Sequence, residues 1–259
     1  MRHIASYFVA FALLLPLFAV GACGAKQQRE ADERREQSNF HFQLAVGHWQ
    51  AREVPLAIRE LEQSLRIDPR NPDSLFLLGF IFQGRRDYDR AVSYYQRALE
   101  AKPGWHEALN NLGTVFLQTS RWEEAIAIYE DLSSMPTYAT PGHAHNNLGW
   151  AYYQLGYHSR ALEQFEMAIL FQPEHCLAYN NRGLVHQELG NVAEARRSYE
   201  QAISLCSRYA EPRYRLAMLL LQTRGDASRA VQLFRDCFDL EPNSNFGRRC
   251  EEYLQGMAP

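Results

Sequence analysis

The chain has 259 residues, of which 46% are hydrophobic and 22% are charged, and its formal net charge is −3. This composition is typical of a globular protein with a substantial core. The weak net charge and the absence of a long basic run argue against a general nucleic-acid binder, so we expect no nucleic-acid partner.

Residues 1–22 have the layout of a secretory signal. Arg2 precedes an apolar run over residues 4–20, which is too short and wrongly flanked for a stable transmembrane helix. The run ends in Val-Gly-Ala followed by Cys23, which resembles the bacterial lipobox. That resemblance implies that Cys23 receives the lipid and becomes the acylated N-terminus. An ordinary signal cleaved after Ala22 is the alternative.

The residues after Cys23 predict the membrane in which the lipid is anchored and the tether that follows it. Gly24 stands where an Asp would suggest retention at the inner membrane, so by analogy we expect a lipid anchor in the outer membrane, on its periplasmic face. Residues 23–37 are polar and charged, which predicts a partly helical tether between the lipid and the globular part.

The segment 72–105 defines the repeating unit of the chain. Its apolar spacing predicts two short amphipathic helices with a break between them. The segment has small residues at its eighth, twentieth and twenty-seventh places, which are Gly79, Ala91 and Ala98. It has an aromatic residue, Tyr95, at the twenty-fourth place and a proline, Pro103, at the thirty-second. This is the signature of the tetratricopeptide repeat (TPR), which has a 34-residue period.

The same pattern recurs along the rest of the chain. We expect six repeats and a capping segment, at residues 38–71, 72–105, 106–141, 142–175, 176–209, 210–244 and 245–259. A single repeat cannot bury its apolar face, so the array is expected to form one domain over residues 38–259. The predicted fold is all-α, a right-handed superhelical solenoid of six TPR helix-turn-helix repeats with a C-terminal capping helix.

The first helix of each repeat lines the concave groove of a TPR solenoid. The groove positions are mostly apolar, and they include Phe42, Val46, Phe76, Phe80, Trp150, Leu177, Leu184 and Tyr214. An apolar groove predicts a bound protein partner, because aromatic side chains exposed to water are stabilised when a partner buries them. Packing of these side chains against neighbouring helices is the alternative.

Asparagine recurs at the fifth position of three consecutive repeats, as Asn110, Asn146 and Asn180. An asparagine amide can both donate to and accept from the backbone of an extended peptide, which favours a partner-binding role. The alternative is that these amides tie adjacent helices together.

Four cysteines follow Cys23, and an even number in an exported chain predicts disulfides. Antiparallel packing brings together the helix ends that carry Cys176 and Cys206, and Cys237 and Cys250 lie on the last repeat helix and the cap. We therefore favour Cys176–Cys206 and Cys237–Cys250, with Cys206–Cys237 or free thiols as alternatives. No metal site is expected, since His143 and His145 point to different helix faces. No catalytic motif is present, so we expect neither an enzyme nor a cofactor nor a small-molecule substrate.

A lipidated Cys23, a charged tether and six TPRs together resemble the pilotin family of type IV pilus lipoproteins. The connection at residues 135–153, MPTYATPGHAHNNLGWAYY, is the most specific point of resemblance. It implies an adaptor that promotes membrane insertion and multimerisation of the secretin PilQ and so supports pilus assembly and twitching-type motility. The alternative is a TPR lipoprotein that scaffolds cell-wall hydrolases or another envelope complex.

Overall fold

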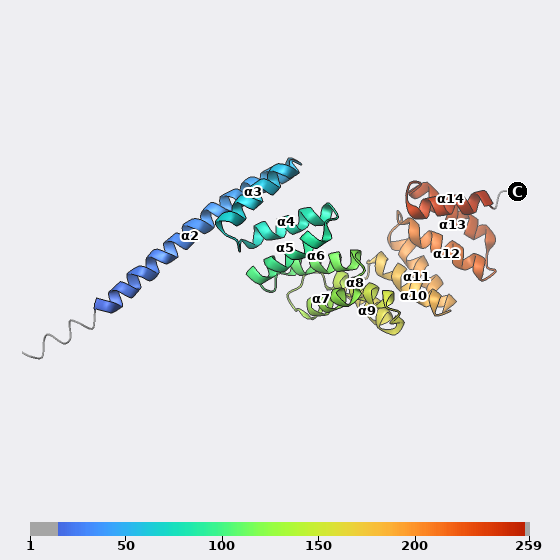
Figure 1. Ribbon diagram of the computed structural model, residues 1–259. Coiled ribbons are helices and arrows are strands. Elements are labelled where there is room, and N and C mark those ends of the chain that lie inside the picture. Colours follow the sequence, from blue (N-terminus) through green and yellow to red (C-terminus); the bar gives the residue numbers. More distant parts are fainter. Residues whose placement is uncertain (1–14, 257–259) are drawn as a thin grey trace, which may run out of the picture. The chain divides into compact units, whose positions relative to one another are not determined.

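The computed structural model describes the backbone of residues 15–256 and the side chains from residue 26 onward. The described residues form thirteen helices and no strand (Figure 1). The helices are α2 Leu15–Gln50, α3 Val54–Ile67, α4 Pro72–Gly84, α5 Tyr88–Ala101, α6 His106–Gln118, α7 Trp122–Ser134, α8 Pro141–Gln154, α9 His158–Phe171, α10 Cys176–Glu188, α11 Val192–Leu205, α12 Ala210–Gln222, α13 Ala227–Leu240 and α14 Asn245–Gly256. Of the predicted signal peptide, residues 1–22, the first fourteen lie outside the described backbone, and the Cys23 side chain, the predicted site of lipidation, lies outside the described side chains.

The chain divides into two compact units, Met1–Ala108 and Leu109–Pro259. The first contains helices α2 to α5, the second contains α7 to α14, and α6 begins in the first and continues into the second. Within each unit, consecutive helices pack as antiparallel pairs joined by short turns.

Helix α2 runs without a break through residues 23–37, the segment predicted to be a partly helical tether. Its exposed part consists largely of good helix formers, and side chains one turn apart interact. Gln28 donates to Asp32 at 3.0 Å, and Lys26 lies 3.9 Å from Glu30. The tether is therefore a helical extension of the first repeat. Among residues 15–256, no helix is both long and apolar enough to cross a membrane.

The small residues of the repeat pattern let each pair of helices approach closely. In the first unit, a Cβ added to Gly79 would lie 2.7 Å from the ring of Tyr95. In the second unit, a Cβ on Gly183 would lie 2.7 Å from the ring of Tyr199. Both rings are fully buried. Glycine on α4 or α10 thus creates the space into which the aromatic ring of the following helix packs.

A small polar residue fills the twenty-seventh place in the first repeat and joins three helices. The Ser64 hydroxyl lies 2.8 Å from that of Ser38 and 2.7 Å from that of Ser74. Asn71 caps α4 by accepting from the Ser74 amide, and its own amide donates to the Ser38 hydroxyl at 2.9 Å. These buried groups satisfy one another, so the first repeat is held to the second by polar contacts as well as by apolar packing.

Helix α14 covers the apolar end of the second unit. The core there is built from α12 and α13, and Phe234 stacks on Tyr253 of α14 with ring centroids 5.0 Å apart. Cys237 and Cys250, both fully buried, form a disulfide that joins α13 to α14. The helix predicted as a cap is therefore bonded covalently to the last repeat helix.

Candidate functional site

Four aromatic side chains of the first unit form a partly exposed cluster, which we call the aromatic surface: Trp49, Phe76, Phe80 and Trp105. Phe76 and Phe80 lie one turn apart on α4 and so share a face. Phe80 meets the edge of Trp49 at 5.9 Å, and Phe76 meets Trp105 at 4.6 Å, between ring centroids. Phe80 is 44% exposed, so the cluster offers an apolar surface to solvent.

The remaining predicted groove residues of this unit come from α2. Phe42 and Val46 are half-buried and lie one turn apart. A basic group lies at the edge of the aromatic surface. The Lys102 ammonium sits 4.2 Å from the centroid of the Trp105 ring, where the ring face attracts a cation. The aromatic surface thus has one ammonium group at its edge, and its apolar area suits an apolar protein segment.

Trp150 of the second unit lies in a more polar setting. Its ring is half-buried and 5.3 Å from that of Tyr153. The Tyr153 hydroxyl donates to Glu188, and His158 lies 3.3 Å from the same carboxylate. Burial and the Glu188 carboxylate raise the pKa of Tyr153, so this hydroxyl stays protonated. This cluster ties α8 to α10 and leaves Trp150 as the accessible apolar group.

Two of the predicted groove residues are part of the core instead. Leu184 and Tyr214 are buried, the first on α10 and the second on α12. Tyr214 packs against Phe234 and Phe246, and the Arg249 guanidinium lies over its ring. The sequence assigned them to the groove from helix position alone. Helices α13 and α14 cover Tyr214, and both residues are too deeply buried to contact a partner.

Two of the recurring asparagines, Asn110 and Asn146, bond to other side chains of the fold, which is the alternative to the partner-binding role predicted for them. Asn146 is buried, and its amide oxygen accepts from Asn181 of the next repeat at 3.1 Å. Asn147 donates to the hydroxyl of Tyr129 at 3.1 Å, and burial raises the pKa of Tyr129 to about 12. Asn110 is half-buried and accepts from Tyr138 at 3.4 Å. These amides are used within the fold.

Asn180 differs from the other asparagines, because both its amide nitrogen and its amide oxygen are buried without a hydrogen-bond partner among the described residues. Such a group costs its full desolvation free energy. We expect Asn180→Ala to raise the free energy of unfolding by about 1 kcal/mol, by removing the unsatisfied amide.

Asn181→Ala is the matched control, since it makes the same change on the same helix but breaks the bond to Asn146. It should lower the free energy of unfolding by about 1 kcal/mol. Chemical denaturation of both variants checks this. An equal loss in both would mean that Asn180 has a partner, such as an internal water.

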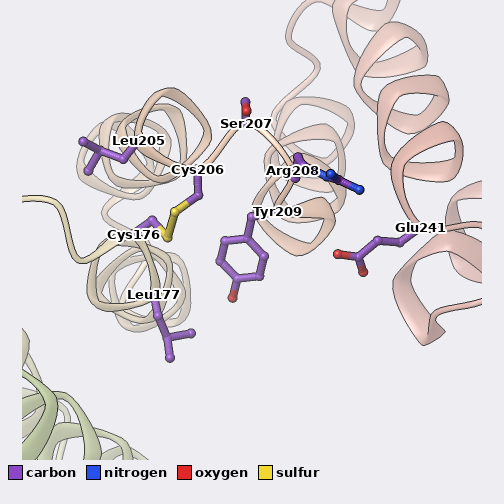
Figure 2. A pocket seen from close by; sticks show the side chains of 8 residues that line it. All are labelled: Cys176, Leu177, Leu205, Cys206, Ser207, Arg208, Tyr209 and Glu241. Carbon is purple, nitrogen blue, oxygen red and sulfur yellow. A yellow bond between two sulfur atoms is a disulfide. The ribbon is translucent and has the colours of Figure 1, made fainter.

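The second disulfide lies beside an open pocket of the second unit. Cys176 and Cys206 are bonded, with their Cα atoms 6.0 Å apart, so both pairings preferred from the sequence are present. A pocket of about 580 Å³ adjoins this bond, and we call it the disulfide pocket (Figure 2). It is lined by Cys176, Leu177, Leu205, Cys206, Ser207, Arg208, Tyr209 and Glu241. Leu177, which the sequence predicts to lie in the groove, is one of the lining residues of this pocket.

The histidines form a pair without further metal ligands. His143 Nδ1 lies 3.1 Å from His175 Nε2, while His145 stacks on Phe171 and bonds Gln164. Burial lowers the pKa of His175, and His143 acts in the same direction. No group of three or more metal-ligating side chains occurs within the described part of the chain.

Comparison with known families accounts for the repeated helix pairs. Models of the tetratricopeptide repeat match residues 42–104, 81–134, 142–175, 176–209 and 213–244, which together are most of the chain. The chain is a tetratricopeptide repeat protein. Two relatives of this TPR protein differ in the share of the chain over which they match it.

It is homologous to the type IV pilus assembly protein PilF of Pseudomonas aeruginosa, with 28% identity over 73% of this chain and 77% of PilF. The chloroplast TPR protein PYG7 of Arabidopsis thaliana is 31% identical over 51% of this chain and 44% of PYG7.

Two solved structures have the same fold as this TPR protein. The structure of Pseudomonas aeruginosa PilF superposes with a TM-score of 0.69 at 22% identity, over 85% of this chain and 99% of PilF. PilW, described as a type IV pilus biogenesis factor, gives 0.70 at 22% identity, over 82% and 97% of the two chains. These likenesses confirm the all-helical TPR solenoid predicted from the sequence.

Proposed function

We propose that this TPR protein is an outer-membrane lipoprotein adaptor that promotes insertion and multimerisation of the type IV pilus secretin PilQ. The homology to PilF carries the proposal, because the match extends over 77% of a type IV pilus assembly protein. TPR families generally serve as non-catalytic scaffolds for protein contacts, which agrees with an adaptor.

The N-terminal part would hold the adaptor at the membrane. Two or three acyl chains on Cys23 give stable anchoring, where a single chain gives only marginal binding. The helical stretch from residue 23 to residue 38 would keep the repeats about 20 Å from the lipid, at 1.5 Å per residue. Anchoring raises the effective concentration of the adaptor beside secretin subunits in the same membrane.

The aromatic surface would hold the secretin subunit. Partly exposed aromatic rings bury a large apolar area when a partner covers them, and such residues dominate the binding energy of interfaces. An apolar secretin segment held there would be shielded from aggregation until subunits associate.

The test is complementation of a deletion strain of the native host with the double variant Phe76→Asp/Phe80→Asp. Two buried charges at the interface should lower the amount of heat-resistant secretin multimers more than tenfold, with secretin monomer still present. Val192→Asp is the control, because the exposed fraction of Val192, 41%, is similar to the 44% of Phe80, while Val192 belongs to the second unit, at the start of α11. It should support normal multimers.

Folding and anchoring are controlled separately. Circular dichroism of the purified double variant should match the wild type, and Cys23→Ser should lose multimers while the protein moves to the soluble fraction. Unchanged multimers in the deletion strain itself would overturn the proposal. Peptidoglycan defects in that strain would then favour the scaffold for cell-wall hydrolases.

A further inference from the structure

The disulfide pocket has separate apolar and charged halves. Figure 2 shows Leu177 and the disulfide on one side of the Tyr209 ring and Arg208 with Glu241 on the other. Leu177 is 39% exposed and Leu205 is 36% exposed, so their apolar area is open to solvent. A volume of about 580 Å³ lies within the range of binding pockets in proteins.

The pocket is held rigid although part of its wall is a connection between helices. The disulfide joins the start of α10 to the end of α11. Arg213 is buried and donates to the backbone carbonyls of Tyr209 at 2.7 Å and of Ser207 at 2.8 Å. A buried guanidinium that bonds two loop carbonyls fixes the wall in place, which lowers the entropy cost of binding.

Two charges at the rim are free to meet a ligand. Neither Arg208 nor Glu241 forms an ion pair with any other described residue, and Arg208 is the more exposed of the two. A guanidinium binds a carboxylate through two parallel hydrogen bonds, which makes Arg208 the stronger anchor. The Glu241 carboxylate can accept from a backbone N–H of a bound segment.

We propose that the disulfide pocket binds an extended segment of a partner protein in which an apolar side chain is followed two residues later by a carboxylate. Side chains at i and i+2 of an extended segment point the same way, so one reaches the apolar half while the other reaches Arg208. An aromatic side chain suits the apolar half, because sulfur atoms contact ring edges favourably. This site goes beyond the proposed function and lies outside the aromatic surface.

The probe is the pentapeptide acetyl-Gly-Phe-Ser-Glu-Gly-amide carrying fluorine on its phenyl ring, observed by ¹⁹F NMR with the full-length chain in detergent micelles. The control peptides replace Glu by Lys or Phe by Gly. We expect the Phe-Ser-Glu peptide to bind about fivefold more tightly than the Phe-Ser-Lys peptide. The peptide that lacks the phenyl ring should not bind, as shown by competition.

Variants of the chain locate the binding. Arg208→Glu should reverse the preference between the Glu and Lys peptides, and Leu205→Asp should abolish binding. Phe80→Asp, on the aromatic surface, should leave binding unchanged, which keeps this test distinct from that of the secretin adaptor. Equal binding of the Glu and Lys peptides, or loss of binding in Phe80→Asp, would overturn the proposal. A dimer of the full chain that Leu205→Asp dissociates, or peptide binding to empty micelles alone, would overturn it as well.

Discussion

Tyr199→Ala should lower the free energy of unfolding of the second unit by about 3–5 kcal/mol, as expected for removal of a fully buried aromatic ring. The ring lies against Gly183 of the preceding helix and is inaccessible to solvent. Glycine at position 183 has no side chain that could fill the resulting space. Urea denaturation followed by circular dichroism, with hydrogen exchange of α10 and α11, measures the loss.

Tyr199→Phe is the matched control for this change. It keeps the ring and removes only the hydrogen bond from the hydroxyl to Gln187, 2.8 Å long, so it should cost about 1 kcal/mol. If Tyr199→Ala costs no more than Tyr199→Phe, the ring does not hold the two helices together and the packing argument for the repeat fails.

Gly247→Ala should destabilise the capping helix α14 by about 3 kcal/mol through overpacking. A Cβ at this position would lie 1.9 Å from the carbonyl oxygen of Glu241, which is backbone and cannot rotate away. The helix would have to move off the turn that it packs against. Hydrogen exchange of the α14 amides, together with thermal denaturation, measures the effect.

Gly47→Ala tests whether the effect comes from the contact and not from replacing glycine as such. Gly47 lies within α2, and nothing is within 4 Å of the Cβ position. Alanine there should stabilise the chain by about 0.5–1 kcal/mol, because glycine is costly in a helix interior. Similar changes in stability for the two variants would contradict the close contact at Gly247.

The charged extension of α2 shows how local sequence and helix formation agree. The stretch from residue 26 to residue 37 has neither glycine nor proline, and it places opposite charges one turn apart. Helix formation there depends on neighbouring residues only. The lack of apolar residues in this stretch nevertheless favours a linker of partial helicity, although its residues have high helix propensity.

The sequence by itself determined the helix pairs. The small, aromatic and proline residues at fixed positions of the 34-residue repeat predict where two helices cross and where each helix ends. It also favoured both disulfides, because antiparallel packing within a repeat brings Cys176 and Cys206 together, and Cys237 and Cys250 lie on consecutive helices, the last repeat helix and the cap. Contacts between repeats decided the rest. Asn146 bonds to Asn181 of the following repeat, and Tyr214 packs against α13 and the capping helix α14, so neighbouring helices decide that these side chains do not face solvent. The disulfide pocket likewise combines residues from 176 to 241. Helical spacing gives the face of a side chain, and only the stacked neighbours determine what covers that face.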